Sequence, residues 1–144
     1  MKVAQILKSK ADDTVFTVKP DATISEVTRI LAEKRIGTVV VSQDGKTPDG
    51  ILSERDIVTA LSQTGSGCLI GTVDDFMTTR VVTCSLDATA DQILSMMTER
   101  RFRHIPVVEN GEMVGLISVG DVVKARLSEL SMEKDALEGM IMGF

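Results

Sequence analysis

Residues 50–58 read GILSERDIV, and residues 115–123 repeat the same pattern as GLISVGDVV. Each stretch has a glycine, two branched aliphatic residues, a serine, two variable residues, an aspartate and two more aliphatic residues. A serine followed three positions later by an acid is the signature of a capping box, in which the two side chains satisfy free amides at a helix N-terminus. The pattern therefore predicts a strand that leads into a helix, twice in one chain.

The repetition extends well beyond this motif. Residues 15–45 align with residues 81–111, with Val, Thr, Asp-Ala-Thr, Glu, Arg, Val and Gly at matching positions. A self-match of this kind indicates a tandem repeat. In each copy a short strand, VFTV or VVTC, precedes Asp-Ala-Thr, whose aspartate and threonine favour a helix start.

These signals predict a β-α-β-β-α unit, and hence an α/β fold. Two strands follow the first helix in each copy, TVVVS then GILS, and HIPVV then VGLIS, and Asn-Gly between the second pair predicts a tight hairpin. All-apolar strand residues such as 39–41 suggest a sheet covered on both faces. The first helix has an apolar face in both copies, made of Ile24, Val27, Ile30 and Leu31 and of Ile93, Met96 and Met97.

The expected domains are residues 1–62 for a lead-in helix (Val3, Ile6, Leu7) and the first repeat, 63–76 for a linker, 77–127 for the second repeat, and 128–144 for an extension of the last helix. Glycine and serine in SQTGSGCLIG (62–71) indicate the linker, and TVDDFMT (72–78) suggests a short helical turn. Units of about 60 residues bury little more than half of their surface alone, so the two should pack together.

The last helix is expected to run from about Asp121 to Met142. Its apolar residues recur at intervals of three, four or seven, which favours a packing or dimer stripe. They are Val123, Leu127, Leu130, Leu137 and Ile141.

Composition excludes several classes of function. The chain has 144 residues, a net charge of −5 and only 3% aromatic residues, without Trp or Tyr, which argues against nucleic-acid binding. No apolar run is long enough to span a bilayer, the first residues lack a signal-peptide pattern, and the two cysteines form no CxxC. A cytoplasmic protein without a membrane segment is therefore expected.

The residue pattern gives little indication of a catalytic site or a metal site. With one histidine, His104, and two separated cysteines, no metal site is predicted. No Ser-His-Asp grouping has supporting context. The acidic pairs Asp12-Asp13 and Asp74-Asp75 are better explained by capping or solvation, because adjacent side chains point apart.

Capping alone explains one copy of the motif, and its repetition favours a binding site as well. A glycine before the serine lets the backbone approach another group closely, although a tight turn would also use one. A helix start after a strand attracts phosphate, a serine hydroxyl adds a hydrogen bond, and an aspartate can accept bonds from ribose hydroxyls. Cations stand nearby at Arg55, Arg101, Arg103 and His104, although a basic helix end would also suit its dipole.

The first repeat has the order strand–DAT–helix–RIGTVVV–GILSERDIV, and the second contains RFRHIPVVENGEMVGLISVGDVV. Over residues 3–127 these motifs resemble a tandem pair of cystathionine-beta-synthase (CBS) domains. The resemblance implies two β-α-β-β-α repeats packed sheet to sheet with pseudo-twofold symmetry, leaving two clefts. It also implies a non-catalytic regulatory module that binds an adenine nucleotide there. AMP is the first choice, with ATP, ADP, NAD(H) or S-adenosylmethionine as further ligands.

The resemblance assigns roles by position. Asp56 and Ser53 would hold ribose and face phosphate in one cleft, and Asp121 and Ser118 would do so in the other. Arg103 and His104 stand at the family's basic positions. The remaining expected nucleotide-binding residues border the adenine, form apolar walls or add charge: Thr17, Val18, Thr38, Val39, Arg55, Thr83, Cys84, Ile105 and Pro106.

The two copies differ where Gly37 and Thr38 replace Arg103 and His104. Two unequal sites are therefore expected, the second being stronger for a charged phosphate, although Arg55 could compensate in the first. A homodimer and a separate effector protein are the expected partners. The alternative function is a ligand-free interaction or oligomerisation module, whereas nucleotide hydrolysis or transfer lacks a nucleophile–base pair.

Overall fold

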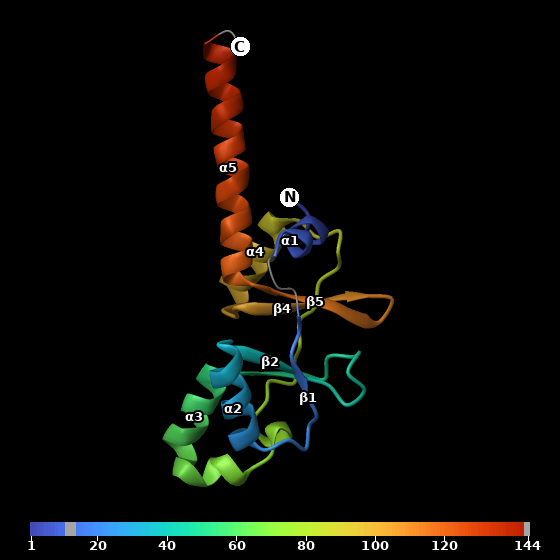
Figure 1. The fold of residues 1–144 in the computed structure, drawn as a ribbon, viewed down its shortest axis with the longest axis vertical. Helices are drawn as coiled ribbons and strands as arrows, with labels where there is room; N and C mark the ends of the chain where they lie inside the picture. The colour runs from blue at the N-terminus through green and yellow to red at the C-terminus, as the bar shows by residue number, and fades with distance from the viewer. Residues whose placement is uncertain (11–13, 143–144) are drawn as a thin grey trace.

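The computed structural model describes residues 1–10 and 14–142, and it contains two α/β units stacked along the long axis of the molecule (Figure 1). The Asp12-Asp13 pair lies outside the described residues. The first unit consists of β1 (Thr17–Val18), α2 (Ile24–Lys34), β2 (Thr38–Val41), β3 (Gly50–Ser53) and α3 (Glu54–Thr64). The second consists of α4 (Ala90–Arg100), β4 (His104–Glu109), β5 (Glu112–Ser118) and α5 (Val119–Ile141).

The predicted repeat architecture is confirmed, with one difference in the second sheet. In the first unit β1 pairs parallel to β2, and β2 pairs antiparallel to β3. In the second unit β4 and β5 form an antiparallel hairpin, but the expected strand VVTC is reduced to a single bridge between Cys84 and Val107. Backbone turns lie on both sides of this bridge, with Val81 N–H donating to Thr79 O and Ala88 N–H donating to Ser85 O.

Local signals set the element ends. Thr23 and Thr89 cap α2 and α4 through capping boxes with Glu26 and Gln92. Asn110 and Gly111 have φ values of 52° and 80°, the pair of positive angles that a tight two-residue hairpin requires. The helix starts and the hairpin therefore follow the sequence prediction.

The segment after α3 is more ordered than its glycine and serine content suggests. α3 continues to Thr64, and two 3₁₀ turns follow, η1 (Gly65–Ile70) and η2 (Val73–Asp75), the second within the predicted helical turn. Cys68 and Val73 are buried, and Val73 belongs to the core of the first unit. This segment therefore packs against the first unit.

Each unit has its own apolar core, and the first helix belongs to the second of them. α1 (Val3–Ser9) buries Val3 and Ile6 against α4, β4, β5 and α5. Backbone hydrogen bonds join Val3 N–H to Ala88 O and Ala90 N–H to Met1 O. The chain thus starts beside the second unit and then crosses to β1 in the first (Figure 1).

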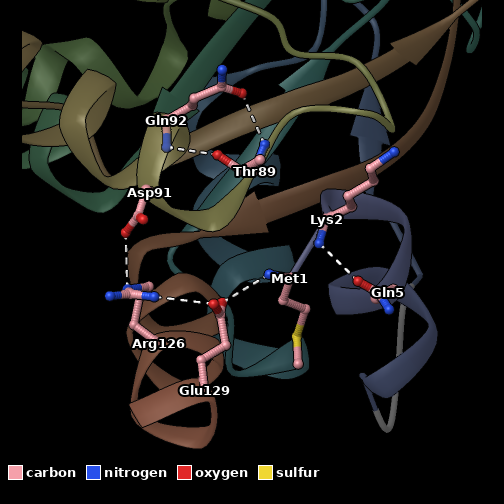
Figure 2. A network of polar contacts seen from close by, with 8 residues as sticks. All are labelled: Met1, Lys2, Gln5, Thr89, Asp91, Gln92, Arg126 and Glu129. Atoms are coloured by element: carbon pink, nitrogen blue, oxygen red, sulfur yellow. Dashed lines mark hydrogen bonds and ion pairs between the residues drawn. The ribbon is translucent and has the colours of Figure 1, made fainter. Parts of the chain in front are cut away.

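A polar network fastens α1 to the second unit (Figure 2). The Met1 ammonium lies 3.0 Å from Glu129 of α5, and Arg126 bridges Glu129 and Asp91 of α4 at 3.0 and 2.9 Å. These contacts hold the start of the chain and the first half of α5 together. Beyond them α5 projects away from both units (Figure 1). Among the described residues, no helix is both long and apolar enough to cross a membrane.

Candidate nucleotide cavities

The two repeated motifs form the starts of α3 and α5, and both capping boxes are complete. Ser53 N–H and Oγ–H donate to Asp56 Oδ2 at 2.8 and 3.0 Å, and Asp56 N–H donates back to Ser53 Oγ at 3.3 Å. Ser118 N–H donates to Asp121 Oδ2 at 2.9 Å, and Asp121 N–H donates to Ser118 Oγ at 3.1 Å. The capping interpretation is confirmed in both copies.

The two motif glycines, Gly50 and Gly115, allow other segments of the same chain to approach the backbone closely. A methyl group added at Gly50 would lie 3.1 Å from the carbonyl oxygen of Thr78, which forms a β-bridge with Ile51. A methyl group at Gly115 would lie 2.8 Å from Cδ1 of Leu7 in α1. The close approach expected at these glycines therefore serves internal packing.

The first motif opens on a cavity of about 270 Å³, which we call the first cavity. It contains the start of α3 together with residues that precede and begin β4 in the other unit. Four of its residues carry or can carry positive charge, and Asp56 lies among them. The lining consists of Thr38, Ser53, Glu54, Arg55, Asp56, Thr78, Arg101, Phe102, Arg103 and His104.

A groove of about 420 Å³, the adjoining groove, shares four of these residues. Arg55, Arg101, Phe102 and Arg103 line both spaces, and the groove adds Met97, Thr98 and Val119. Three arginines thus stand where the two hollows meet. In the described part of the chain, Asp56 makes hydrogen bonds only within its own capping box.

The second motif is arranged differently. Ser118 lines a cavity of about 510 Å³, the second cavity, with Lys10, Lys34, Thr38 and His104, and its remaining lining is Thr14, Phe16, Ile36, Gly37 and Leu116. Asp121 instead lines a separate pocket of about 360 Å³ between α1 and α5.

Lys10 lines both the second cavity and this separate pocket. Its ammonium lies 3.1 Å from Asp121 Oδ2 and donates a hydrogen bond to Leu116 O at 3.0 Å, and both charged side chains are mostly buried. Burial raises the pKa of Asp121, while hydrogen bonds from the Ser118 backbone and Lys10 lower it, with the net result below its ordinary value. The second motif's carboxylate is therefore already neutralised within the chain.

The cavities meet at a direct contact between equivalent positions of the two units. Thr38 Oγ1 and His104 Nδ1 are 3.1 Å apart, and both residues line both cavities. Burial holds the pKa of His104 below its ordinary value, with Asp121 opposing this and Lys10 and Arg103 adding to it. His104 is accordingly neutral at pH 7 and suited to hydrogen bonding.

The expected site residues divide into two groups. Thr38, Ser53, Arg55, Asp56, Arg103 and His104 come together at the first cavity. Other expected residues lie elsewhere. Val18, Val39, Ile105 and Pro106 are buried, Thr17 is exposed on β1, and Thr83 and Cys84 line a separate shallow cavity with residues of α4.

The positively charged side chains are grouped differently from what the sequence predicted. Arg103 was expected to strengthen the second motif's cleft, but it lines the first cavity and the adjoining groove, beside Arg55. The physical reason is that the strands of one unit face the helix start of the other. Sequence reasoning also left Lys10, Lys34 and Phe102 out of the site, since only the packing of the two units brings them there.

Comparisons with known proteins agree with this architecture. The CBS domain family model matches residues 3–63 and again residues 73–128. The CBS-domain containing protein ATU1752 from Agrobacterium tumefaciens has a crystal structure with a TM-score of 0.83 and 45% identity, covering 88% of this chain and 99% of that one. The mitochondrial CBS domain-containing protein CBSX3 of Arabidopsis thaliana is 29% identical over 98% of this chain and 72% of its own length.

A further solved structure is the CBS domain pair of protein MJ0100, in complex with 5-methylthioadenosine and S-adenosyl-L-methionine. Its TM-score is 0.76 with 24% identity, covering 90% of this chain and 98% of that one. At that identity the likeness concerns the fold. Two matches of the family model, together with two capped β-α-β-β-α units, place this chain in the CBS-domain family as a tandem CBS pair.

Proposed function

We propose that this CBS pair, a regulatory module, binds an adenine nucleotide in the first cavity, with AMP as the first choice. The observation that carries the proposal is the meeting of Asp56, Arg55, Arg103 and His104 in one hollow between the two units. A carboxylate beside several cations suits a ligand that has vicinal hydroxyls and a phosphate.

The chemistry of each group follows from its position. Asp56 accepts Ser53 N–H and Oγ–H on Oδ2, which leaves its other oxygen for ribose hydroxyls. Arg55 and Arg103 supply charge for the phosphate, and the start of α3 adds its dipole. The first cavity alone is smaller than most ligand pockets, and the adjoining groove extends it to a size that suits a nucleotide.

The bound ligand would act by population shift. Because the first cavity has walls from both units, a ligand that contacts both stabilises one relative arrangement of them. The module needs no catalytic step for this. A cytoplasmic location, a homodimer and a separate effector protein belong to the same proposal.

The complexes of MJ0100 with two adenosine derivatives support an adenosine-type ligand. ATP, ADP, NAD(H) and S-adenosylmethionine are the other ligands to be compared with AMP. Three arginines outnumber the carboxylates of Glu54 and Asp56 in the first cavity, and this excess of positive charge favours a phosphate-bearing ligand over the sulfonium cation of S-adenosylmethionine.

Thermal unfolding with each of these ligands tests the proposal, together with native mass spectrometry of the protein purified from its host. A ligand at about 100 times its Kd stabilises the folded state by about 2.7 kcal/mol. AMP is expected to raise the Tm more than adenosine or GMP does. If none of the adenine ligands raises the Tm and none co-purifies, the proposal is overturned in favour of a ligand-free interaction module.

A further inference from the structure

α5 has an exposed apolar seam that starts near the second unit and continues along the projecting part of the helix. Val123, Leu127, Leu130, Leu137 and Ile141 recur at the alternating spacing of three and four residues that defines the core positions of a coiled coil, and Lys134 occupies the one remaining core position. We call these six residues the α5 seam. Leu127 is 62% exposed, Leu137 57% and Ile141 77%. A helix of 23 residues, about 34 Å long, thus presents an uncovered stripe along most of its length.

The other residues that the structure describes do not cover this seam. α1 and α4 pack on another face of α5, where Val122 and Ala125 are buried and Arg126 and Glu129 join the polar network of Figure 2. Residues 130–138 are all exposed. An exposed helix of this length gains most of its stability from packing an apolar face, so a partner is needed.

The charged residues along the α5 seam indicate the partner helix and the direction in which it runs. In a parallel pair of these helices, Lys134 would face the partner's Lys134 in the core, and Glu133 would face the partner's Glu138 at both edges. Both contacts are repulsive. The charges at the seam therefore oppose a parallel pair.

An antiparallel pair replaces these clashes with attraction. When Leu127 packs against the partner's Leu137, Lys134 faces the partner's Leu130, and Val123 faces the partner's Ile141. Lys124 then lies along the edge near the partner's Glu138, and twofold symmetry makes this attraction twice. Like charges meet only near the axis, where the two Glu133 carboxylates and the two Lys134 ammonium groups come together and can pair with one another.

We propose that α5 pairs with α5 of a second copy of this chain as an antiparallel coiled coil, with Leu127 against the partner's Leu137. This inference specifies the homodimer of the proposed function and is independent of whether a nucleotide binds. The two units of each protomer would then lie at opposite ends of the paired helices, because α5 begins at the second unit and projects away from it (Figure 1).

Disulfide trapping tests the register directly. The variants Leu127→Cys and Leu137→Cys are made in a Cys84→Ser background, and one of the two carries an affinity tag so that mixed dimers differ in mass. The remaining thiol, Cys68, is buried. The expected result is a disulfide between the two variants when they are mixed, and little disulfide in either variant alone. Disulfides within each variant alone would show a parallel pair and overturn the inference.

A charge swap with sedimentation analysis gives an independent readout. Lys124→Glu is expected to weaken the dimer about threefold to tenfold, and adding Glu138→Lys to the same chain should restore it. Glu138→Lys alone also loses the contact with Lys134 on the same helix, at 3.8 Å, and serves as the matched control. If the wild type is a dimer but the double variant does not regain its dimer affinity, the antiparallel register alone is overturned. If the wild type sediments as a monomer, the homodimer is overturned as well. Thermal shifts with AMP on the same variants report nucleotide binding separately.

Discussion

Replacement of Asp56 by asparagine separates its capping role from its proposed role in ribose binding. The amide oxygen of asparagine can still accept the Ser53 N–H bond, which is 2.8 Å long in the wild type. The amide nitrogen, however, takes the place of the second carboxylate oxygen, so ribose loses a charged acceptor. The helix start should therefore survive while the ligand contact is lost.

The size of the effect follows from the lost bond. A hydrogen bond to a charged group contributes about 1.5–3 kcal/mol, which corresponds to about a tenfold to hundredfold rise in the Kd for AMP. Asp121→Asn is the matched control, because Asp121 already binds Lys10 at 3.1 Å and lines a different pocket. That variant is expected to change the Kd by less than about threefold.

Isothermal titration calorimetry with AMP measures both variants, and thermal unfolding without ligand checks that their helix caps are intact. An equal loss of affinity in the two variants, or a larger loss in Asp121→Asn, would contradict the proposed role of Asp56 in ribose binding. A large loss of Tm in Asp56→Asn without ligand would show that the carboxylate is needed for the fold itself, and that the cap does not tolerate an amide.

Three further predictions follow from single contacts. Lys10→Met removes the ammonium from Asp121 and is expected to raise the AMP stoichiometry measured by calorimetry; an unchanged stoichiometry would show that Lys10 does not block the second motif. Burial lowers the folded-state pKa of His104, so the free energy of unfolding should be highest above about pH 6.5 and decline as the pH falls further. His104→Gln should flatten that decline in urea titrations, and an unaltered slope would contradict the assignment. Gly50→Ala should lower the free energy of unfolding by about 1–3 kcal/mol, because its methyl group meets Met77 Sδ at 2.5 Å and Thr78 O at 3.1 Å; a neutral effect in urea unfolding would show that the segment yields easily.

The parts of the fold that the sequence predicted are those decided by local chemistry. Ser53 and Ser118 start helices because a serine and an acid three residues later satisfy the same free amides, whichever unit they are in. The hairpin at Asn110-Gly111 follows from two residues that tolerate positive φ. The repeat itself then fixed the order of the elements.

The candidate site was predicted less completely, because it depends on how the units pack. Nothing near Arg103 in the sequence indicates that it lines the cavity of the other unit's motif. Lys10 is far from Asp121 along the chain, and only the packing of α1 on the second unit brings the two charges together. The sequence predicted a close approach at the motif glycines but not the groups that make it, since Leu7 and Thr78 approach them from distant segments.

A crystal structure of the protein with AMP would show which cavity holds the nucleotide. AMP is expected in the first cavity, with ribose hydroxyls on Asp56 and the phosphate near Arg55 and Arg103. A nucleotide bound on the Ser118 and Lys34 side, or a first cavity that stays empty at saturating AMP, would contradict it.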